Sequence, residues 1–428
     1  MTALRDVRRL GDIEATFAYQ HALMHGDAQV TTEFTVNAEF CPEYVAQAVA
    51  RWVRRFPLLL LRIGEVRGSL WFQQGPGLCP GQLTQGEPAG PGRPSDLLAD
   101  EVNDVLPAGG GLWRLRVVHG RDTAATRFCF TVHPALFDAH STGRLVRGLL
   151  DMLFSQAAVD GVRPAVESLP PATDELTYVA PPPAAPDLRT AGGRPGGAWQ
   201  AGPPQAAGRR PPWSARRAGV VSLSLPPRES LRLNRWCAER RIAPGHFLAA
   251  ALARVHARTT GQEEVVLSNA VSLRRRYAEH VVMPDAGCCL HEVAAALRIG
   301  GGPTVDHARA YASSLRAADA AWRPARREHA RIRRVVEAEA AGGTGPDIRV
   351  TDAGSVDVAL GVHAARVTRF RTAVNRKATP AVGALHVSAL RGALGLSLTY
   401  GMPGADSATA ETTARELRNE ALRPAGPG

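Results

Sequence analysis

The chain has 428 residues, of which 45% are hydrophobic and 21% charged, as is ordinary for a globular protein. This composition excludes a wholly disordered chain, a collagen-like repeat and a coiled coil, and the length allows two to four domains. Because no run of roughly 18 apolar residues is present and the N-terminus has no signal-peptide core, we expect a cytoplasmic protein with no membrane contact.

The formal net charge is +11, from 51 basic and 40 acidic residues. All but one of the basic residues, Lys377, are arginines, and they are spread along the whole chain. No tract interleaves them with aromatic residues as single-strand binders do, which argues against a nucleic-acid partner. A solvated basic surface accounts for the charge, and a carrier domain with acidic helices would fit it equally well.

Six cysteines are present, and none forms a Cys-x-x-Cys pair. The missing ligand spacing argues against a structural zinc site, so we expect no metal. Cys288 and Cys289 are adjacent and invite interpretation as a nucleophile. Since no histidine stands at a recognisable spacing, we interpret them as small buried side chains.

The first half of the chain, taken as residues 1–160, alternates strand and helix patterns. Period-two alternation or short apolar runs predict strands over 30–38, 58–63, 69–73, 112–118 and 127–132. Helical spacing of apolar residues predicts helices over 42–54 and 141–154. This mixture predicts an α/β lobe with a sheet and covering helices.

Residues 161–219 contain 12 prolines and 8 glycines, including three consecutive prolines from Pro181. Such a stretch cannot carry regular structure through most of its length, so we interpret it as a linker. Beyond it, residues 220–428 repeat the α/β mixture. Strands are predicted over 220–225, 264–273, 347–351, 356–362, 384–390 and 394–399, and helices over 227–240, 245–259, 305–338 and 407–422.

One segment combines residue types that carry chemistry. A predicted strand ends at His133-Pro134, a short loop contains Asp138-Ala139-His140, and a helix begins near Ser141, which we expect to be its N-cap. A histidine fixed at a strand end, followed by an acid in a loop, is a common catalytic arrangement.

This segment resembles the His-His-x-x-x-Asp-Gly motif of the condensation-domain and polyketide-associated acyltransferase superfamily, which is related to chloramphenicol acetyltransferase. His133 matches the first histidine, Asp138 the aspartate and Ser141 the serine that often follows. Pro134 replaces the second histidine, Ala139 the glycine and His140 the usual aromatic residue. The motif is therefore degenerate at its most informative positions.

Other segments resemble the family in the same order along the chain. They are residues 54–63, 244–253, 265–274, 287–290, where the family's latch asparagine is lost, and 396–400 with the helix after it. The resemblance implies two acetyltransferase-like lobes in a V-shaped pseudo-dimer, with a tunnel between them and the histidine motif at its centre. It also implies a salt bridge between Asp138 and Arg274 that shapes the motif loop.

The resemblance implies acyl transfer from a thioester to a small amine or hydroxyl acceptor. The co-substrate would be an acyl-pantetheine on an acyl or peptidyl carrier protein, or a coenzyme A thioester, with no permanently bound cofactor. Pro134 has no side-chain acceptor and no N–H, so the family's best-placed catalytic group is absent. His133 should point away from position 134, because strand side chains alternate.

Three interpretations remain open. His133 or His140 acts as the base, and for His140 the helix dipole favours a neutral imidazole. Alternatively, the enzyme works by holding donor and acceptor together, because thioesters are already activated. In the third, catalysis is lost and the fold serves as a condensation-like scaffold that binds or recruits a partner. We expect an acyltransferase of secondary metabolism in the nonribosomal peptide and polyketide class, with the scaffold as the alternative.

Overall fold

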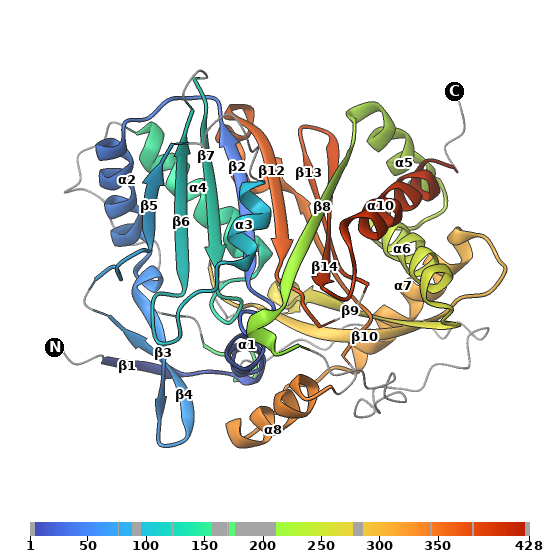
Figure 1. Ribbon diagram of the computed structural model, residues 1–428, viewed down its shortest axis with the longest axis horizontal. Coiled ribbons are helices and arrows are strands. Elements are labelled where there is room, and N and C mark those ends of the chain that lie inside the picture. The colour runs from blue at the N-terminus through green and yellow to red at the C-terminus, as the bar shows by residue number, and fades with distance from the viewer. Residues whose placement is uncertain are drawn as a thin grey trace.

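The computed structural model describes residues 5–75, 77–87, 96–120, 124–155, 169, 171–175, 211–276, 286–342, 345–378 and 381–423. These residues form two lobes side by side, each built on a β-sheet with helices packed against it (Figure 1). The two-lobed α/β architecture predicted from the sequence is confirmed.

The first lobe contains a five-stranded sheet in the order β12-β2-β7-β6-β5. The strands are β12 (Val367–Val374), β2 (Val30–Val36), β7 (Thr126–Val132), β6 (Trp113–His119) and β5 (Leu83–Gly86). Neighbours are antiparallel except for β5 and β6. In Figure 1, α4 (Ala139–Phe154) lies behind this sheet and α3 (Leu97–Asn103) in front of it. Helix α2 (Pro42–Arg55) packs against α4.

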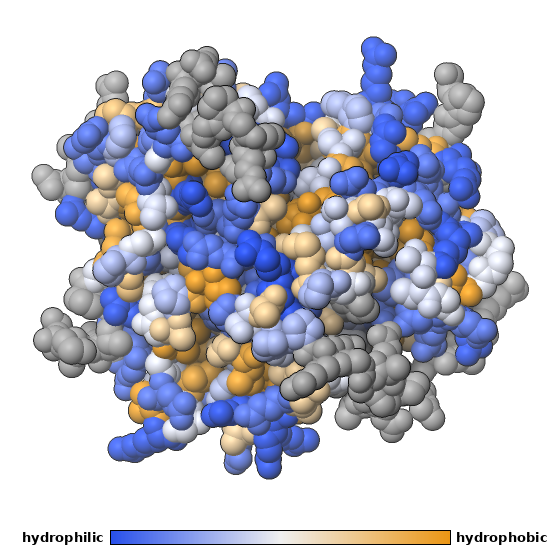
Figure 2. Space-filling view, in the orientation of Figure 1, coloured by the Kyte–Doolittle hydropathy of each residue, from blue (hydrophilic) through white to orange (hydrophobic). Residues whose placement is uncertain are grey.

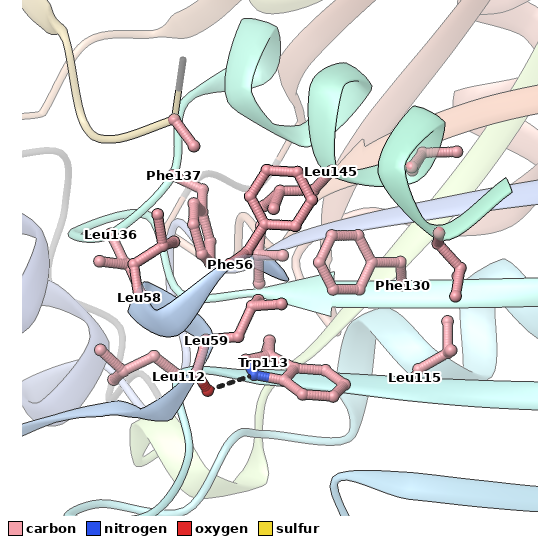
Figure 3. Packing of buried hydrophobic residues seen from close by; sticks show 14 of the residues in the cluster. Phe56, Leu58, Leu59, Leu112, Trp113, Leu115, Phe130, Leu136, Phe137 and Leu145 are labelled. Atoms are coloured by element: carbon pink, nitrogen blue, oxygen red, sulfur yellow. Dashed lines mark hydrogen bonds between the residues drawn. The ribbon is translucent and has the colours of Figure 1, made fainter. Parts of the chain in front are cut away.

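Large aromatic side chains fill the space between the sheet and the α2/α4 pair (Figure 3). Trp52 and Trp113 meet edge to face at 5.2 Å between ring centroids. Their indole nitrogens donate to backbone carbonyls, Trp113 to Leu59 at 2.7 Å and Trp52 to Leu145 at 3.0 Å. Because both N–H groups are satisfied, the two rings stabilise the core without an unpaired polar atom.

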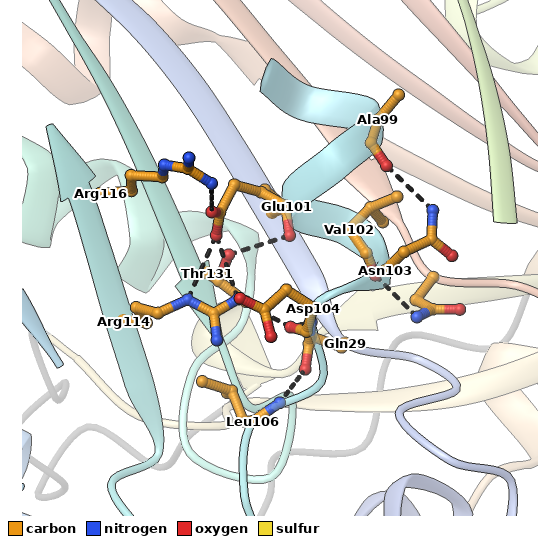
Figure 4. Close-up of polar contacts among 12 residues, drawn as sticks. Gln29, Ala99, Glu101, Val102, Asn103, Asp104, Leu106, Arg114, Arg116 and Thr131 are labelled. Atoms are coloured by element: carbon orange, nitrogen blue, oxygen red, sulfur yellow. Dashed lines mark hydrogen bonds and ion pairs between the residues drawn. The ribbon is translucent and has the colours of Figure 1, made fainter. Parts of the chain in front are cut away.

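An ion pair fixes α3 on the front of the sheet (Figure 4). The buried carboxylate of Glu101 accepts from Arg114 at 3.0 Å and from Arg116 at 2.9 Å. The side chain of Asn103, at the end of α3, exchanges two hydrogen bonds with the backbone of Ala218 in the second lobe, both 2.7 Å long. Helix α3 therefore joins the two lobes.

A small sheet, β1-β4-β3, extends the first lobe. Its strands are β1 (Arg5–Arg9), β4 (Ser69–Gln74) and β3 (Leu61–Val66), and α1 (Asp12–Leu23) follows β1. The predicted strand over 58–63 is wrong in its first part, because Pro57–Leu60 form a 3-10 turn. Proline at the start of this segment has the fixed φ of a helical turn.

The second lobe contains a six-stranded sheet in the order β10-β9-β11-β13-β14-β8. The strands are β10 (Leu290–Arg298), β9 (Glu264–Ser272), β11 (Ile348–Ser355), β13 (Val382–Leu390), β14 (Ala393–Met402) and β8 (Arg217–Leu225). The helices of this lobe are α5 (Pro227–Glu239), α6 (Pro244–Thr260), α7 (Thr304–Ala321) and α10 (Ser407–Leu422). The alanine-rich α6 is almost wholly buried because it packs at the centre of this core.

The second half of the chain also contributes to the first lobe. Strand β12 pairs with β2 and completes the first lobe's sheet, although it follows β11 along the chain. Strand β8 begins at Arg217, within the stretch interpreted as a linker. Residues 171–175 of that stretch are also placed, and the Asp174 carboxylate accepts from the Asp12 backbone at 3.2 Å. The rest of the predicted linker, apart from residue 169 and residues 211–219, lies outside the described residues.

Two further sequence predictions differ from the structure. The segment predicted as a strand over 356–362 forms helix α9 (Val356–Leu360) and the start of a 3-10 turn (Gly361–Arg366). Its valines favour a strand in the sequence pattern, but Val356 and Val358 line the lobe junction and Val362 is exposed. The helix predicted over 305–338 is two helices, α7 and α8 (His329–Ala340), separated around Pro324. Proline disfavours a helical residue before it, which explains the break.

Candidate functional site at the lobe junction

The degenerate motif lies where β7 ends and α4 begins. His133 directly follows β7, residues 134–136 form a turn, and Asp138 precedes the first residue of α4. The N-cap of α4 is Asp138 and not Ser141 as predicted, because the Asp138 carboxylate accepts from the Ser141 backbone N–H at 2.8 Å. An aspartate satisfies this position as well as a serine does, and its charge complements the helix dipole.

Asp138 also forms a buried ion pair with Arg274, which follows β9. Both side chains are almost completely excluded from solvent. The hydroxyl of Ser141 accepts from Arg274 at 3.0 Å and lies 2.7 Å from the Asp138 carboxylate. The structure therefore brings together the three residues that the sequence analysis assigned to the shape of the motif loop. The pair crosses from one lobe to the other.

The segment after residue 286 completes this network through its backbone. Cys289 N–H donates to the Asp138 carboxylate at 3.1 Å, and Gly287 N–H donates to the Ser141 hydroxyl at 3.0 Å. Backbone groups thus hold the motif loop here, and the side chains of Cys288 and Cys289 are buried. Burial raises the pKa of the Cys288 thiol well above its ordinary value, which disfavours a thiolate nucleophile.

His133 is buried inside the first lobe. Its Nδ1 accepts from the Ala135 backbone N–H at 3.1 Å, and its ring lies 4.4 Å from the ring of His21 on α1. Burial, together with the neighbouring His21, holds the pKa of His133 well below its ordinary value. Both the hydrogen bond and the ring contact join His133 to residues of its own lobe, so this geometry favours a structural role for His133.

A cavity of about 450 Å³ lies between the lobes. Its walls come from β2 and α4 of the first lobe and from β11, α9, β12 and β13. The hydrophobic side chains that line it are Val30, Ala139, Ala353, Val356, Val358, Ala359 and Phe370. Two threonines on neighbouring strands, Thr32 and Thr372, also line it and share a hydrogen bond of 3.0 Å.

The cavity contains two imidazoles. His140, the second residue of α4, is exposed, and Val358 beside the cavity is 80% exposed, so this end is the mouth. His386 on β13 is buried at 4% exposure. Of the residues proposed from the sequence as catalytic, His140 lines the cavity, whereas His133 and Asp138 do not.

Part of the motif lies at this cavity. The resemblance implied a tunnel between the lobes with the histidine motif at its centre. Pro134 is buried and is not among the residues that line this cavity. The cavity instead meets the second part of the motif at Ala139 and His140.

His386 and α9 were missed by the sequence analysis. The strand over 384–390 was predicted, yet its histidine stands among apolar residues with no motif around it. Helix α9 was assigned to a strand, which hid its place in the cavity wall. A histidine in an otherwise apolar strand, at the position opposite to the core-facing residues, was the signal available.

Other classes of site find no support among the described residues. No group of three or more histidine, cysteine, aspartate or glutamate side chains there is arranged to hold a metal ion. Within the same residues, no helix combines the length and apolar character of a membrane-crossing segment.

No protein-family model matches the chain, and no curated protein matches it by sequence. Solved structures do match it over nearly the full length. Polyketide synthase associated protein 5 from Mycobacterium tuberculosis is 15% identical, with a TM-score of 0.66 and full coverage of both chains. The first condensation domain of the CDA synthetase is 18% identical, with a TM-score of 0.66, covering 98% of this chain and 97% of that domain.

A third similar structure is trichothecene 15-O-acetyltransferase from Fusarium sporotrichioides. It is 13% identical, with a TM-score of 0.67, and the match covers 97% of this chain and 95% of that enzyme. The chain therefore has the fold of the condensation-domain and chloramphenicol acetyltransferase-like superfamily, with its two lobes. The fold predicted from the resemblance is confirmed.

Proposed function

We propose that the protein is a condensation-domain-like acyltransferase of secondary metabolism. It would transfer an acyl group from a carrier-protein or coenzyme A thioester to an amine or hydroxyl. The observation that carries this proposal is the cavity at the lobe junction, which combines hydrophobic walls with two imidazoles. A pocket of this size, lined by apolar side chains together with hydroxyl, imidazole and guanidinium groups, suits a small organic substrate.

The polar groups of the cavity fit the needs of acyl transfer. A thiolate leaves easily, so the reaction requires mainly close placement of donor and acceptor and one group that handles the acceptor's proton. Neutral imidazole performs that role near neutral pH. His140 stands at the mouth, where it would contact the polar arm of the thioester, while Val30, Phe370 and Val356 would surround apolar parts of the substrates.

A scaffold is the second candidate, and the geometry of His133 and Pro134 favours it. The family's second histidine is replaced by proline, and His133 is engaged by Ala135 and His21. In this case the fold would bind a partner protein without turnover. The intact cavity argues for acyl transfer, since a scaffold has no need of a lined pocket between its lobes.

The experiment is thioester turnover by the purified protein. Acetyl-, hexanoyl- and benzoyl-coenzyme A and the matching N-acetylcysteamine thioesters serve as donors. Benzylamine and benzyl alcohol serve as acceptors, and the amide or ester product is followed by mass. We expect product well above the uncatalysed rate, with a rise in KM for the donor in His140→Ala. No product above that rate with any pair, while the protein remains folded, would favour the scaffold.

A further inference from the structure

The position of His386 on β13 sets the direction of its side chain. Its neighbours Leu385 and Val387 both belong to the hydrophobic core of the second lobe. Because successive strand residues point to opposite faces, His386 points to the other face, toward the junction. The cavity lining agrees, since His386 is part of it together with Phe370 and Thr372 of β12.

Neither ring nitrogen of His386 has a hydrogen-bond partner within the described part of the chain. A buried polar group without a partner destabilises the folded protein, so an unsatisfied imidazole requires an explanation. Other buried histidines here are held by neighbours. His329, for example, accepts from Leu70 N–H at 2.8 Å and lies 2.9 Å from the Leu10 carbonyl. A structural role in which neighbouring groups hold the ring by hydrogen bonds therefore does not account for His386.

Polar residues flank His386 on the same face of the sheet. In the strand register, His386 lies opposite Thr351 of β11 and Ser397 of β14, and Ser397 lies opposite Ser222 of β8. Directly opposed residues point to the same side of a sheet. The sheet thus carries a row of three hydroxyls and one imidazole on the face that looks to the lobe junction, whereas its other face packs against helices.

We propose that His386 is a catalytic residue of the acyl transfer and takes the proton of the acceptor inside the cavity. This inference rests on the proposed function. One ring nitrogen of His386 receives the proton from the acceptor's hydroxyl or amine as its oxygen or nitrogen attacks the thioester carbonyl carbon. The C–S bond then breaks, and the leaving sulfur receives the proton from the imidazolium, giving an ester or amide and a free thiol.

In the resting protein, the His386 ring is in the form that can accept a proton. Burial lowers the pKa of His386 to about 4, so the ring is neutral at pH 7 and has a free nitrogen lone pair. The negative charge that develops on the carbonyl oxygen during attack stabilises the imidazolium that forms. The buried His386 then transfers the proton, and His140 at the mouth of the cavity binds the donor.

The test compares kcat and KM for the full-length protein and variants, with the donors and acceptors named above. We expect His386→Ala and His386→Gln to lose at least about 100-fold in kcat, within the range that general-base removal gives, with KM changed less than threefold. Free imidazole in the buffer should restore part of the activity of His386→Ala. Glutamine keeps the polar volume of the ring, and circular dichroism with a melting curve checks the fold of each variant.

His256→Gln is the matched control, since His256 is buried on α6 of the same lobe and does not line this cavity. It should retain wild-type kcat. Active wild type with His386→Gln within threefold of it would overturn the role of His386 and leave the proposed function intact. No turnover by the wild type would overturn both. A packing effect would lower kcat equally in His386→Ala and in His256→Gln, and free imidazole would not restore it. That result would overturn the catalytic role.

Discussion

The guanidinium of Arg274, two residues after the end of β9, crosses the lobe junction and pairs with the carboxylate of Asp138 at the N-terminus of α4. The same carboxylate accepts from the backbone of Ser141 and Cys289. Hydrogen bonds from both lobes thus converge on one side chain. The pair fixes the start of α4, and with it the placement of Ala139 and His140 in the cavity wall.

We predict that Asp138→Asn and Arg274→Ala each lower the free energy of unfolding by about 3–5 kcal/mol. Removal of one partner leaves the other charge buried without compensation, which is the costly way to break such a pair. Urea unfolding followed by circular dichroism measures the effect. Arg418→Ala is the control, because its pair with Glu229 is partly exposed and should contribute at most about 1 kcal/mol. A cost below that of the control would contradict the buried-pair interpretation.

A close contact between α4 and α9 gives a second prediction. A Cβ atom added to Gly143 would lie 2.8 Å from the Cβ of Ala359, closer than two non-bonded carbon atoms approach each other. We therefore expect Gly143→Ala to push the helices apart and to destabilise the protein by about 1–3 kcal/mol, despite alanine's better helix propensity.

The double variant Gly143→Ala/Ala359→Gly tests the cause. Removal of the Ala359 methyl makes room for the new one, so the two changes should couple by about 1 kcal/mol or more in a double-mutant cycle. The free energy of unfolding is measured for the wild type, the two single variants and the double variant. Additive effects would mean that the clash is relieved elsewhere and that α4 and α9 do not limit each other.

The sequence predicted much of the fold because amphipathic patterns are local. The stripe of Leu145, Leu149 and Leu153 identified α4, and the alternation around Phe128 identified β7. The Asp138–Arg274 pair came only from family resemblance, since nothing in the spacing of 136 residues connects them. His386 could not be assigned, because the cavity forms only when β13, β12 and α4 meet in three dimensions.

The failures have physical reasons as well. Valines such as Val356 and Val362 are typical of strands, yet this segment forms a helix and a turn that pack along α4. Strand β12 was not predicted, and its partner β2 lies in the other half of the chain, so the exchange of a strand between lobes left no local signal.

Acid should destabilise the protein through the buried imidazoles of His21 and His133. Burial lowers the pKa of His21 to about 4 and that of His133 also falls, whereas unfolded histidines have values near 6.5. Between pH 4 and 6.5 the unfolded chain thus binds more protons than the folded protein. The contribution of these histidines to the free energy of unfolding is fully present above about pH 6.5 and falls as the pH decreases toward 4. Each histidine contributes up to about 1.4 kcal/mol per pH unit.

Urea unfolding at several pH values between 7 and 4.5 measures that slope. The His21→Gln variant should show a shallower loss of stability on acidification, since one buried imidazole with a lowered pKa is removed. His25→Asn, at an exposed position just beyond α1 with a positive φ that asparagine tolerates, controls for removal of a histidine. An unchanged slope in His21→Gln would assign the acid sensitivity to other groups.

Restoration of the motif by Pro134→His should not raise turnover. Position 134 is buried in the turn between β7 and α4 and does not line the cavity, so an imidazole there would not reach the substrates by the route through His140. We expect kcat within threefold of wild type or lower, and a loss of stability of about 1–3 kcal/mol from burial of a polar ring.

The assay is the same thioester turnover, and Pro107→His is the control because Pro107 is an exposed turn proline in the same lobe. A tenfold or larger rise in kcat for Pro134→His alone would contradict this prediction. It would mean that a second opening reaches the first part of the motif and that the cavity at Ala139 and His140 is only its outer end. Equal kcat values for wild type and both proline variants would instead leave proton transfer to the imidazoles already in the cavity.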